Sequence, residues 1–369
     1  MKKILYILNS NGIGGAEASI KRMNENYFEN ADVLTMWGHT NVQNDFWNFN
    51  HNGRVINITD HSLSTSVLLK VIKELVSYLK VNKYDVIQTQ LKGSDIIVGF
   101  LVYIGLVKKK KLIASLRNNY EFYYEAGVKN RVVGMVHKFF MKKAFDKIVV
   151  VSRQDLDKFK KDFGDKLVVI ENSINYEKFV KKESFDYEKE NINIAMVGNV
   201  KHRKGYDKLI ELFKLLKNET KIYTFSIAGG IEDELLKNEV IELSKKFTNV
   251  KVNFCGKISN INEFLLENDI FLSLSRVEGL PISVLEAMAI KIPIILSNID
   301  AHSLIVDDTI KELVLFDSTD KCSDNIKNIN LNYQLIIQNQ YELLKRRFNF
   351  ENMCKKYEDV YNETGESND

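Results

Sequence analysis

Two carboxylates, Glu278 and Glu286, lie eight residues apart in the string EGLPISVLEAMA. The preceding run, IFLSLS, has the composition of a strand, and the residues after Pro281 have the composition of a short apolar helix. We expect Pro281 at the first helical position, where its missing N–H carries no penalty. The free N–H groups and the positive dipole end of such a helix start form an anion site. A carboxylate beside an anion site must bind a group other than the anion. Sugar hydroxyls are suitable because one carboxylate can accept hydrogen bonds from two of them.

A basic loop in NVKHRKGYDKLIELF follows another predicted strand, NIAMVG, and precedes a predicted helix. Its cations are Lys201, Arg203 and Lys204. Cations in a loop between strand and helix can hold a pyrophosphate. A solvated basic loop would have the same composition, but the nearby glutamate pair favours the functional interpretation for Lys204.

The elements that must position these residues alternate between strand and helix patterns along the whole chain, which indicates an α/β fold with parallel sheets. A charged, apolar-poor segment at residues 180–191 divides the pattern into two series. We therefore expect two Rossmann-like domains, at residues 1–180 and 190–345. In such sheets ligands bind at the carboxyl ends of the strands, where every motif discussed here falls. Residues 346–369 are expected to form a last helix and a polar tail.

Composition excludes several classes of protein. The chain has 369 residues, 45% of them hydrophobic and 27% charged, which is ordinary for a globular protein. A net charge of +3 gives no field that would favour nucleic acid. The apolar start of the chain is expected to be a first strand rather than a signal peptide, and the apolar run at residues 96–107 a buried helix rather than a membrane span.

Metal and disulfide sites are not expected. The three cysteines form no CxxC pair, which fits a reducing compartment. The six histidines are dispersed, and the D-x-D string that begins at Asp155 is interpreted as a helix start.

The complete string around Glu278 and Glu286 resembles the donor site of the retaining family 4 glycosyltransferases of the GT-B fold. The resemblance implies two Rossmann-like domains that face each other across a cleft, with a C-terminal helix that crosses back to the N-terminal domain. It implies that Glu286 binds the ribose hydroxyls of a nucleotide and that Glu278 contacts the donor sugar. Each charge-assisted hydrogen bond would contribute about 1.5–3 kcal/mol. The backbone after Glu278 would help to hold sugar and phosphate, at Gly279, Leu280, Pro281 and Ile282.

The basic loop resembles the pattern G-R-x-x-x-x-K-G of the same family, whose Arg and Lys hold the diphosphate. Lys204 matches the Lys, whereas Asn199 stands where the family usually has Arg. Arg203 or Lys201 is then expected to supply the missing contact. In the similar run VNFCGKIS, the backbone near Ile258 would contact the nucleobase.

In the first half, NSNGIGGAEASI resembles the G-G-x-E loop of the family, with Gly14 and Gly15 letting the backbone approach donor phosphates or acceptor. A tight turn before a helix is the alternative. Arg117 follows the predicted strand KLIASL at a position where the family often has His. It is expected either to stabilise charge on the leaving group or acceptor, or to form a structural ion pair.

Basic residues at 108–147, on a helix with Phe139, Phe140 and Phe145, suit a face that rests on anionic lipid, and many relatives use lipid-linked acceptors. A solvated basic face whose aromatic residues, Phe139, Phe140 and Phe145, lie in the core is the alternative.

The sequence thus predicts a metal-independent, retaining hexosyltransferase without a cofactor. It would move a sugar from a nucleotide sugar, with UDP favoured, to a glycan or lipid-linked glycan in bacterial surface polysaccharide synthesis. We expect it in the cytoplasm or on the inner face of the plasma membrane. Two alternatives stay open: a nucleotide-sugar epimerase of the same fold, and a non-catalytic partner or glycan-binding subunit.

Overall fold

The structure, a computed structural model, describes residues 2–12, 15–38, 47, 53–108, 110–125 and 127–363, apart from the side chain of Lys129. The chain divides into two compact units. The first contains Met1–Asn172 and Glu351–Asp369, and the second contains Ser173–Phe350. Each unit has its own hydrophobic core.

The first unit is built on a parallel sheet whose described strands run in the order β3-β2-β1-β4-β5-β6-β7. The strands are β1 (Ile4–Ser10), β2 (Asp32–Trp37), β3 (Val55–Asn57), β4 (Val86–Gln90), β5 (Lys111–Leu116), β6 (Lys147–Val150) and β7 (Leu167–Val169). The helices are α1 (Gly15–Asn26), α2 (Thr65–Val81), α3 (Leu91–Tyr103), α4 (Tyr120–Tyr124), α5 (Val128–Ala144) and α6 (Leu156–Phe163). Because β1 connects outward to β2 while β4 lies on its other side, the order reverses between β1 and β4.

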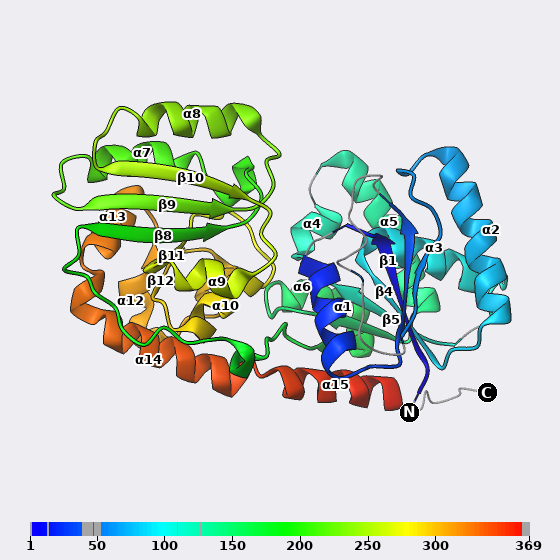
Figure 1. The fold of residues 1–369 in the computed structure, drawn as a ribbon. Coiled ribbons are helices and arrows are strands. Elements are labelled where there is room, and N and C mark those ends of the chain that lie inside the picture. Colours follow the sequence, from blue (N-terminus) through cyan, green and yellow to red (C-terminus); the bar gives the residue numbers. More distant parts are fainter. Residues whose placement is uncertain are drawn as a thin grey trace. The chain divides into compact units, whose positions relative to one another are not determined.

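The second unit repeats this plan with the order β10-β9-β8-β11-β12-β13 (Figure 1). Its strands are β8 (Asn191–Val197), β9 (Ile222–Ala228), β10 (Val250–Gly256), β11 (Ile270–Ser273), β12 (Ile294–Ser297) and β13 (Leu315–Phe316). Its helices are α7 (Lys208–Leu216), α8 (Glu234–Ser244), α9 (Ile261–Leu266), α10 (Ile282–Ile290), α11 (Asp300–Ser303), α12 (Lys311–Val314), α13 (Thr319–Lys327) and α14 (Ile329–Arg347).

Helices cover both faces of the second sheet (Figure 1). Helix α7 packs against α8 and α13, while α10 packs against α9 and α14. Strand β12 is buried along its whole length, as the continuous apolar run IILS predicts for a sheet covered on both faces. The order reverses between β8 and β11, which is the place where doubly wound sheets bind ligands.

Helix α15 (Phe350–Asn362) belongs to the first unit, as the resemblance to the family 4 enzymes implied. The Tyr361 hydroxyl donates a hydrogen bond of 2.6 Å to Oε1 of Gln88 and lies 3.3 Å from the Tyr6 hydroxyl. Tyr357, one helical turn earlier, is fully buried. The expectation of two Rossmann-like domains, each with a parallel sheet, is confirmed.

The expectation of a buried helix at residues 96–107 is wrong in part. Helix α3 buries Val98 and Leu101, but Phe100, Tyr103 and Leu106 are between 38% and 53% exposed. Only one face of α3 packs on the sheet and on α5, and the apolar run continues past the helix end at Tyr103. In the part of the chain that the structure describes, no helix combines the length and the apolar composition that crossing a bilayer requires.

Candidate functional site

Lys204 and Glu278 meet at the reversal point of the second sheet. Lys204 ends a 3-10 turn after β8, and Glu278 lies in the loop between β11 and α10. The Lys204 Nζ is 2.5 Å from Oε1 of Glu278, and the two side chains are 16% and 10% exposed. Ser275 donates a second hydrogen bond of 2.7 Å to the same carboxylate oxygen. Two residues 74 positions apart thus form one polar centre at the carboxyl edge of the sheet.

Two glycines let the basic loop fold tightly enough to place Lys204. Gly205 has a φ of +74°, and a Cβ there would lie 2.0 Å from the carbonyl oxygen of Leu274. Gly198 has a φ of +144°, and a Cβ there would lie 2.7 Å from the Lys204 side chain. The carbonyl of Gly198 also accepts a hydrogen bond of 2.7 Å from the hydroxyl of Tyr206. Any other residue at these positions would displace the loop.

Glu278 is held as a carboxylate anion. Burial by itself raises its pKa, but the charge of Lys204, the hydrogen bonds from Lys204 and Ser275, and the charge of Arg203 together bring the pKa below the usual value for glutamate. The site therefore presents a buried negative charge beside a positive one. That arrangement can bind hydroxyl groups and an anion next to each other.

His302, which the sequence analysis set aside among dispersed histidines, lies behind this centre. It is fully buried on α11, and burial lowers its pKa to about 4 despite the hydrogen bond to Ser297. Its Nδ1 is 2.7 Å from the carbonyl oxygen of Ser297, which requires a proton on Nδ1. Its Nε2 is 3.4 Å from the Ser273 hydroxyl, which in turn bonds Ser275 at 3.3 Å. With its proton on Nδ1, the neutral imidazole has none to donate from Nε2, and Ser273 gives its one hydroxyl proton to Ser275. His302 therefore packs beside the serines next to Glu278 without a hydrogen bond to Ser273.

Helix α10 supplies the rest of the predicted donor motif. Glu286 lies on this nine-residue helix and is 8% exposed, so that its carboxylate is largely shielded from water. Leu280 and Pro281 are buried, while Gly279 and Ile282 are partly exposed. The cap of α10 makes no side-chain hydrogen bond, and the N–H of Val284 donates to the carbonyl of Pro281 at 3.2 Å, which leaves the N–H groups of Ile282 and Ser283 for a ligand.

The sequence analysis expected Pro281 at the first helical position, and this expectation is wrong. It is the cap residue, with a ψ of 106°, and the helix begins at Ile282. The extended ψ fits the sharp turn that brings the chain from Glu278 into the helix.

Asn199 and Lys201 are already engaged by Glu232. The Asn199 amide donates a 2.6 Å hydrogen bond to Glu232 and accepts one of 2.9 Å from the N–H of Gly230. Lys201 forms an ion pair of 3.0 Å with the same glutamate. Arg203 forms no ion pair with the residues that the structure describes, although its charge contributes to the low pKa of Glu278. Of the two cations considered in place of the missing arginine, Arg203 is thus the one that forms no ion pair within the described ranges.

Ile258 follows β10, at the same edge of the sheet. It is partly buried and packs against the core of the second unit. Its backbone is thereby fixed, as contact with a base edge would require.

Arg117 follows β5 in the first unit and is 9% exposed. Its guanidinium donates to Gln90 at 2.8 Å, Ser19 at 3.1 Å and Asn172 at 2.6 Å. These partners are neutral, and no carboxylate among the described residues lies within ion-pair distance. The structural ion pair, one of the two expectations for Arg117, is therefore not formed. Nη2 is buried and has no hydrogen-bond partner among the described residues, which leaves the N–H groups of this nitrogen for a ligand.

Gly15 begins α1, and a Cβ there would contact nothing within 4 Å. Gly14 lies outside the described residues. Within the described ranges, no three His, Cys, Asp or Glu side chains gather as a metal site would require.

Comparisons with known proteins agree with this geometry. Residues 177–340 match the family model of the glycosyl transferases group 1. The O-antigen biosynthesis glycosyltransferase WclY of Escherichia coli is 28% identical over 309 residues, which cover 80% of this chain and 84% of that protein. An uncharacterized 41.2 kDa protein in the cps region of Klebsiella pneumoniae is 28% identical, with 74% of each chain covered.

Among solved structures, Alr3699/HepE of Anabaena, crystallised with UDP and glucose, superimposes with a TM-score of 0.79 at 16% identity. The match covers 98% of this chain and 99% of that one. Residues 177–340 therefore form a domain of the glycosyl transferases group 1 type, and the chain has the GT-B fold of these solved structures.

Proposed function

We propose that the second unit binds a nucleotide diphosphate sugar, with UDP favoured, and that the enzyme transfers the sugar with retention as a family 4 enzyme. The buried pair of Lys204 and Glu278 carries this proposal. It places a cation suited to a diphosphate and an anion suited to sugar hydroxyls within 2.5 Å of each other. Alr3699/HepE, which has the same fold, was crystallised with UDP-glucose, which supports the choice of donor.

The ion pair explains how the site would accept its donor. Lys204 satisfies the charge of Glu278 in the structure. An incoming diphosphate offers Lys204 a doubly charged partner, and the donor sugar offers Glu278 hydroxyl donors in return. Both charges stay paired throughout, so the site avoids an isolated buried charge, which would cost several kcal/mol. Lys204 and Arg203 would then stabilise the departing diphosphate while the acceptor hydroxyl attacks.

The remaining donor contacts follow from helix α10. Its free N–H groups and dipole favour a phosphate or the sugar near residues 279–282. Glu286, one turn into the helix, would accept the two ribose hydroxyls, and the backbone at Ile258 would contact the base. These contacts need no metal ion, so we propose metal-independent catalysis in which the protein groups carry the charge stabilisation.

The first unit would bind the acceptor. Arg117 is buried, positively charged and keeps the N–H groups of Nη2 for a ligand, which suits an anionic group or a hydroxyl of the acceptor. The names of WclY and of the cps-region protein point to surface polysaccharide as the product class. We propose a glycan or lipid-linked glycan acceptor, handled at the cytoplasmic face of the membrane.

An exposed surface on α3 and α5 suits contact with anionic lipid. Tyr103 and Phe139 are 53% and 42% exposed, and their rings lie 5.2 Å apart. Met135 is 63% exposed, and the exposed Lys142 and Lys143 end the helix. Phe145, which the sequence analysis counted on this face, is 1% exposed and belongs to the core. An apolar patch flanked by lysines is the pattern of an interfacial helix.

The test is transfer with a defined donor and a membrane extract as acceptor source. UDP release should occur with one UDP-sugar, persist in EDTA, and fall by about 10² or more in Glu278→Gln, as expected for loss of a charge-stabilising group. The anomeric coupling constant of the new linkage, read by NMR, should match that of the donor. An inverted linkage or loss of activity in EDTA would contradict the mechanism. Conversion of the nucleotide sugar without acceptor would indicate an epimerase instead.

A further inference from the structure

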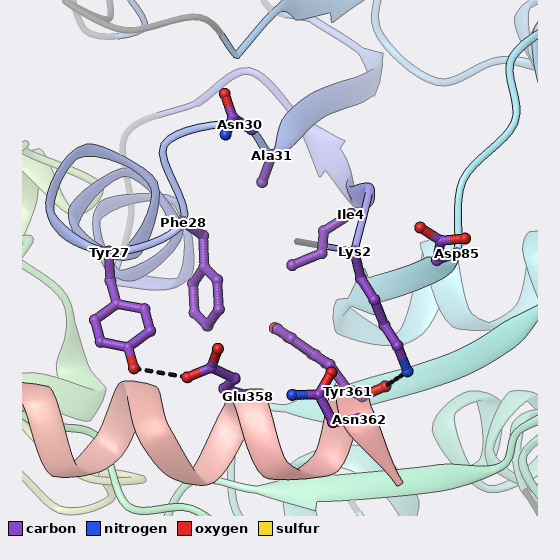
Figure 2. A pocket seen from close by; sticks show the side chains of 10 residues that line it. All are labelled: Lys2, Ile4, Tyr27, Phe28, Asn30, Ala31, Asp85, Glu358, Tyr361 and Asn362. Carbon is purple, nitrogen blue, oxygen red and sulfur yellow. Dashed lines mark hydrogen bonds between the residues drawn. The ribbon is translucent and has the colours of Figure 1, made fainter. Parts of the chain in front are cut away.

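A cavity of about 720 Å³ lies in the first unit, at the amino ends of β1 and β4 and thus at the opposite edge of the sheet from Arg117. Its walls come from four places: the start of β1, the connection between α1 and β2, Asp85 just before β4, and the last turns of α15 (Figure 2). The volume is in the range of small-molecule sites in proteins, roughly 300–1,000 Å³. Neither the donor-site residues nor Arg117 lines it.

The inner wall of this pocket is apolar and aromatic. Ile4, Phe28 and Ala31 contribute buried side chains, and the ring of Phe28 packs on that of Tyr361 with centroids 5.3 Å apart. Figure 2 shows the rings of Tyr27 and Phe28 side by side, facing α15. These groups cannot move easily, since Tyr361 is anchored to Gln88 under the sheet. The pocket is therefore preformed.

The rim of the pocket is polar and only partly engaged. Glu358 accepts a 2.8 Å hydrogen bond from the Tyr27 hydroxyl, and Asp85 accepts one of 2.7 Å from the N–H of Lys3. Each carboxylate has further acceptor capacity. The side-chain amides of Asn30 and Asn362 bond none of the described residues, and both face water. The rim thus offers acceptors and amide donors together.

Charge and polarity select the class of ligand. The pocket contains two carboxylates and one ammonium, Lys2, whose Nζ is 2.6 Å from the carbonyl oxygen of Tyr361. That balance disfavours a phosphate or a nucleotide diphosphate. A wholly apolar ligand would leave the rim groups without water or partner. A neutral sugar fits both parts, because its C–H face can cover the aromatic wall while its hydroxyls donate to Glu358 and Asp85.

We propose that this pocket is a second carbohydrate site, which holds a neutral sugar unit of the glycan acceptor away from the reacting end. This proposal rests on the proposed function in one respect: the ligand is called part of a glycan because the enzyme is proposed to act on glycans. A site of this kind would raise affinity for long acceptors by adding a second point of attachment, without any part in the chemistry.

Saturation-transfer NMR on the full chain, without nucleotide, tests the proposal directly. The probes are the methyl glycosides of glucose, galactose, N-acetylglucosamine and N-acetylgalactosamine. At least one should bind the wild type and bind about tenfold more weakly to Glu358→Gln, because a charge-assisted acceptor becomes a neutral one. The glutamine oxygen can still accept from Tyr27, so the fold should be kept, as a melting curve would verify.

Rim and donor-site variants separate the two sites. Asn30→Ala/Asn362→Ala should weaken binding as well, whereas Asn238→Ala, an exposed asparagine on α8, should not. Binding must survive in Glu286→Ala. If it is lost there and unchanged in the pocket variants, the sugar occupies the donor site, which overturns this proposal and supports the proposed function. If none of the four glycosides binds, the proposal of a second carbohydrate site is overturned. The proposed function is tested separately, by measuring the binding of UDP.

Discussion

Replacing Lys204 by Met keeps the length of the side chain and removes the ammonium that ends 2.5 Å from Glu278. The carboxylate, 10% exposed, then keeps the hydrogen bond from Ser275 but has no neighbouring cation within ion-pair distance among the described residues. Removing one partner of a buried ion pair costs about 3–5 kcal/mol. Because protonation of Glu278 can relieve part of this, we expect about 2–3 kcal/mol at neutral pH. For a unit of this size, that lowers the melting temperature by roughly 4–12 °C.

The assay is differential scanning calorimetry of the second unit's transition, with Lys201→Met as the matched control. Lys201 pairs with Glu232 at 3.0 Å, but these side chains are 32% and 48% exposed. Surface pairs of this kind contribute about 0–1 kcal/mol, so the control should melt close to wild type. The double variant Lys204→Met/Glu278→Gln removes the isolated charge and should recover most of the lost stability.

The pH dependence gives the sharper comparison. In the wild type the pKa of Glu278 is lowered on folding, so its contribution is present above the unfolded pKa and is lost as pH falls through the folded pKa. In Lys204→Met the lysine charge is absent, so burial raises the pKa of Glu278. The free energy of unfolding of this variant then decreases as the pH increases, because the buried carboxyl group must lose its proton. The difference in melting temperature between the two proteins should therefore shrink on acidification. A Lys204→Met protein that melts like Lys201→Met, or a difference independent of pH, would refute this reasoning.

Three further outcomes are expected from single residues. Burial lowers the pKa of His302 from 6.5 to about 4, so the unfolded chain binds a proton in that window and the folded protein does not. The free energy of unfolding should therefore fall by up to roughly 3 kcal/mol as the pH falls from 6.5 to about 4. In calorimetry, the His302→Asn variant should lose less stability over this range than the wild type. Gly205→Ala would place a Cβ 2.0 Å from the carbonyl oxygen of Leu274, and should abolish UDP binding in titration calorimetry. Met135→Glu should weaken sedimentation with phosphatidylglycerol vesicles about tenfold, since a buried Met contributes about 1.5–3 kcal/mol.

Each of these outcomes has a control and a contradicting result. His202→Asn, at a histidine whose side chain is 74% exposed, should leave the acid sensitivity unchanged, and equal effects of the two variants would reject the role of burial. Gly256→Ala, at a φ of +67° with open space around the Cβ, should cost only backbone strain and keep UDP binding. Leu235→Glu on α8, 84% exposed, should not affect sedimentation, and an unchanged Met135→Glu protein would exclude this surface from lipid contact.

The order of strands and helices was open to prediction because most elements carry a clear apolar period. DVLTMW and KLIASL, for example, form β2 and β5 with the expected limits. Strands β3 and β13 have three and two residues, too few to show a period. The exposure of α3 could not be predicted either, since an apolar run does not reveal which of its faces packs on the sheet.

The glutamate motif was visible because its residues are contiguous, whereas the groups that surround it are not. His302 approaches Ser273 because β11 and β12 pair in parallel and end at the same edge, a relation absent from local sequence. The choice between Lys201 and Arg203 depended on Glu232, which follows another strand. Long-range contacts of this kind arise from the packed sheet and leave no spacing signal in the chain.

A thermal-shift titration with UDP, GDP and ADP, on wild type, Glu286→Ala and Glu239→Ala, tests the central claim most directly. A ligand at a hundredfold excess over its Kd stabilises the protein by about 2.7 kcal/mol. We predict stabilisation of the wild type by UDP, its loss in Glu286→Ala, and its retention in Glu239→Ala, where an exposed glutamate of α8 is changed. Equal stabilisation of all three proteins, or of none by any nucleotide, would contradict a nucleotide-sugar site built on Glu278 and Glu286.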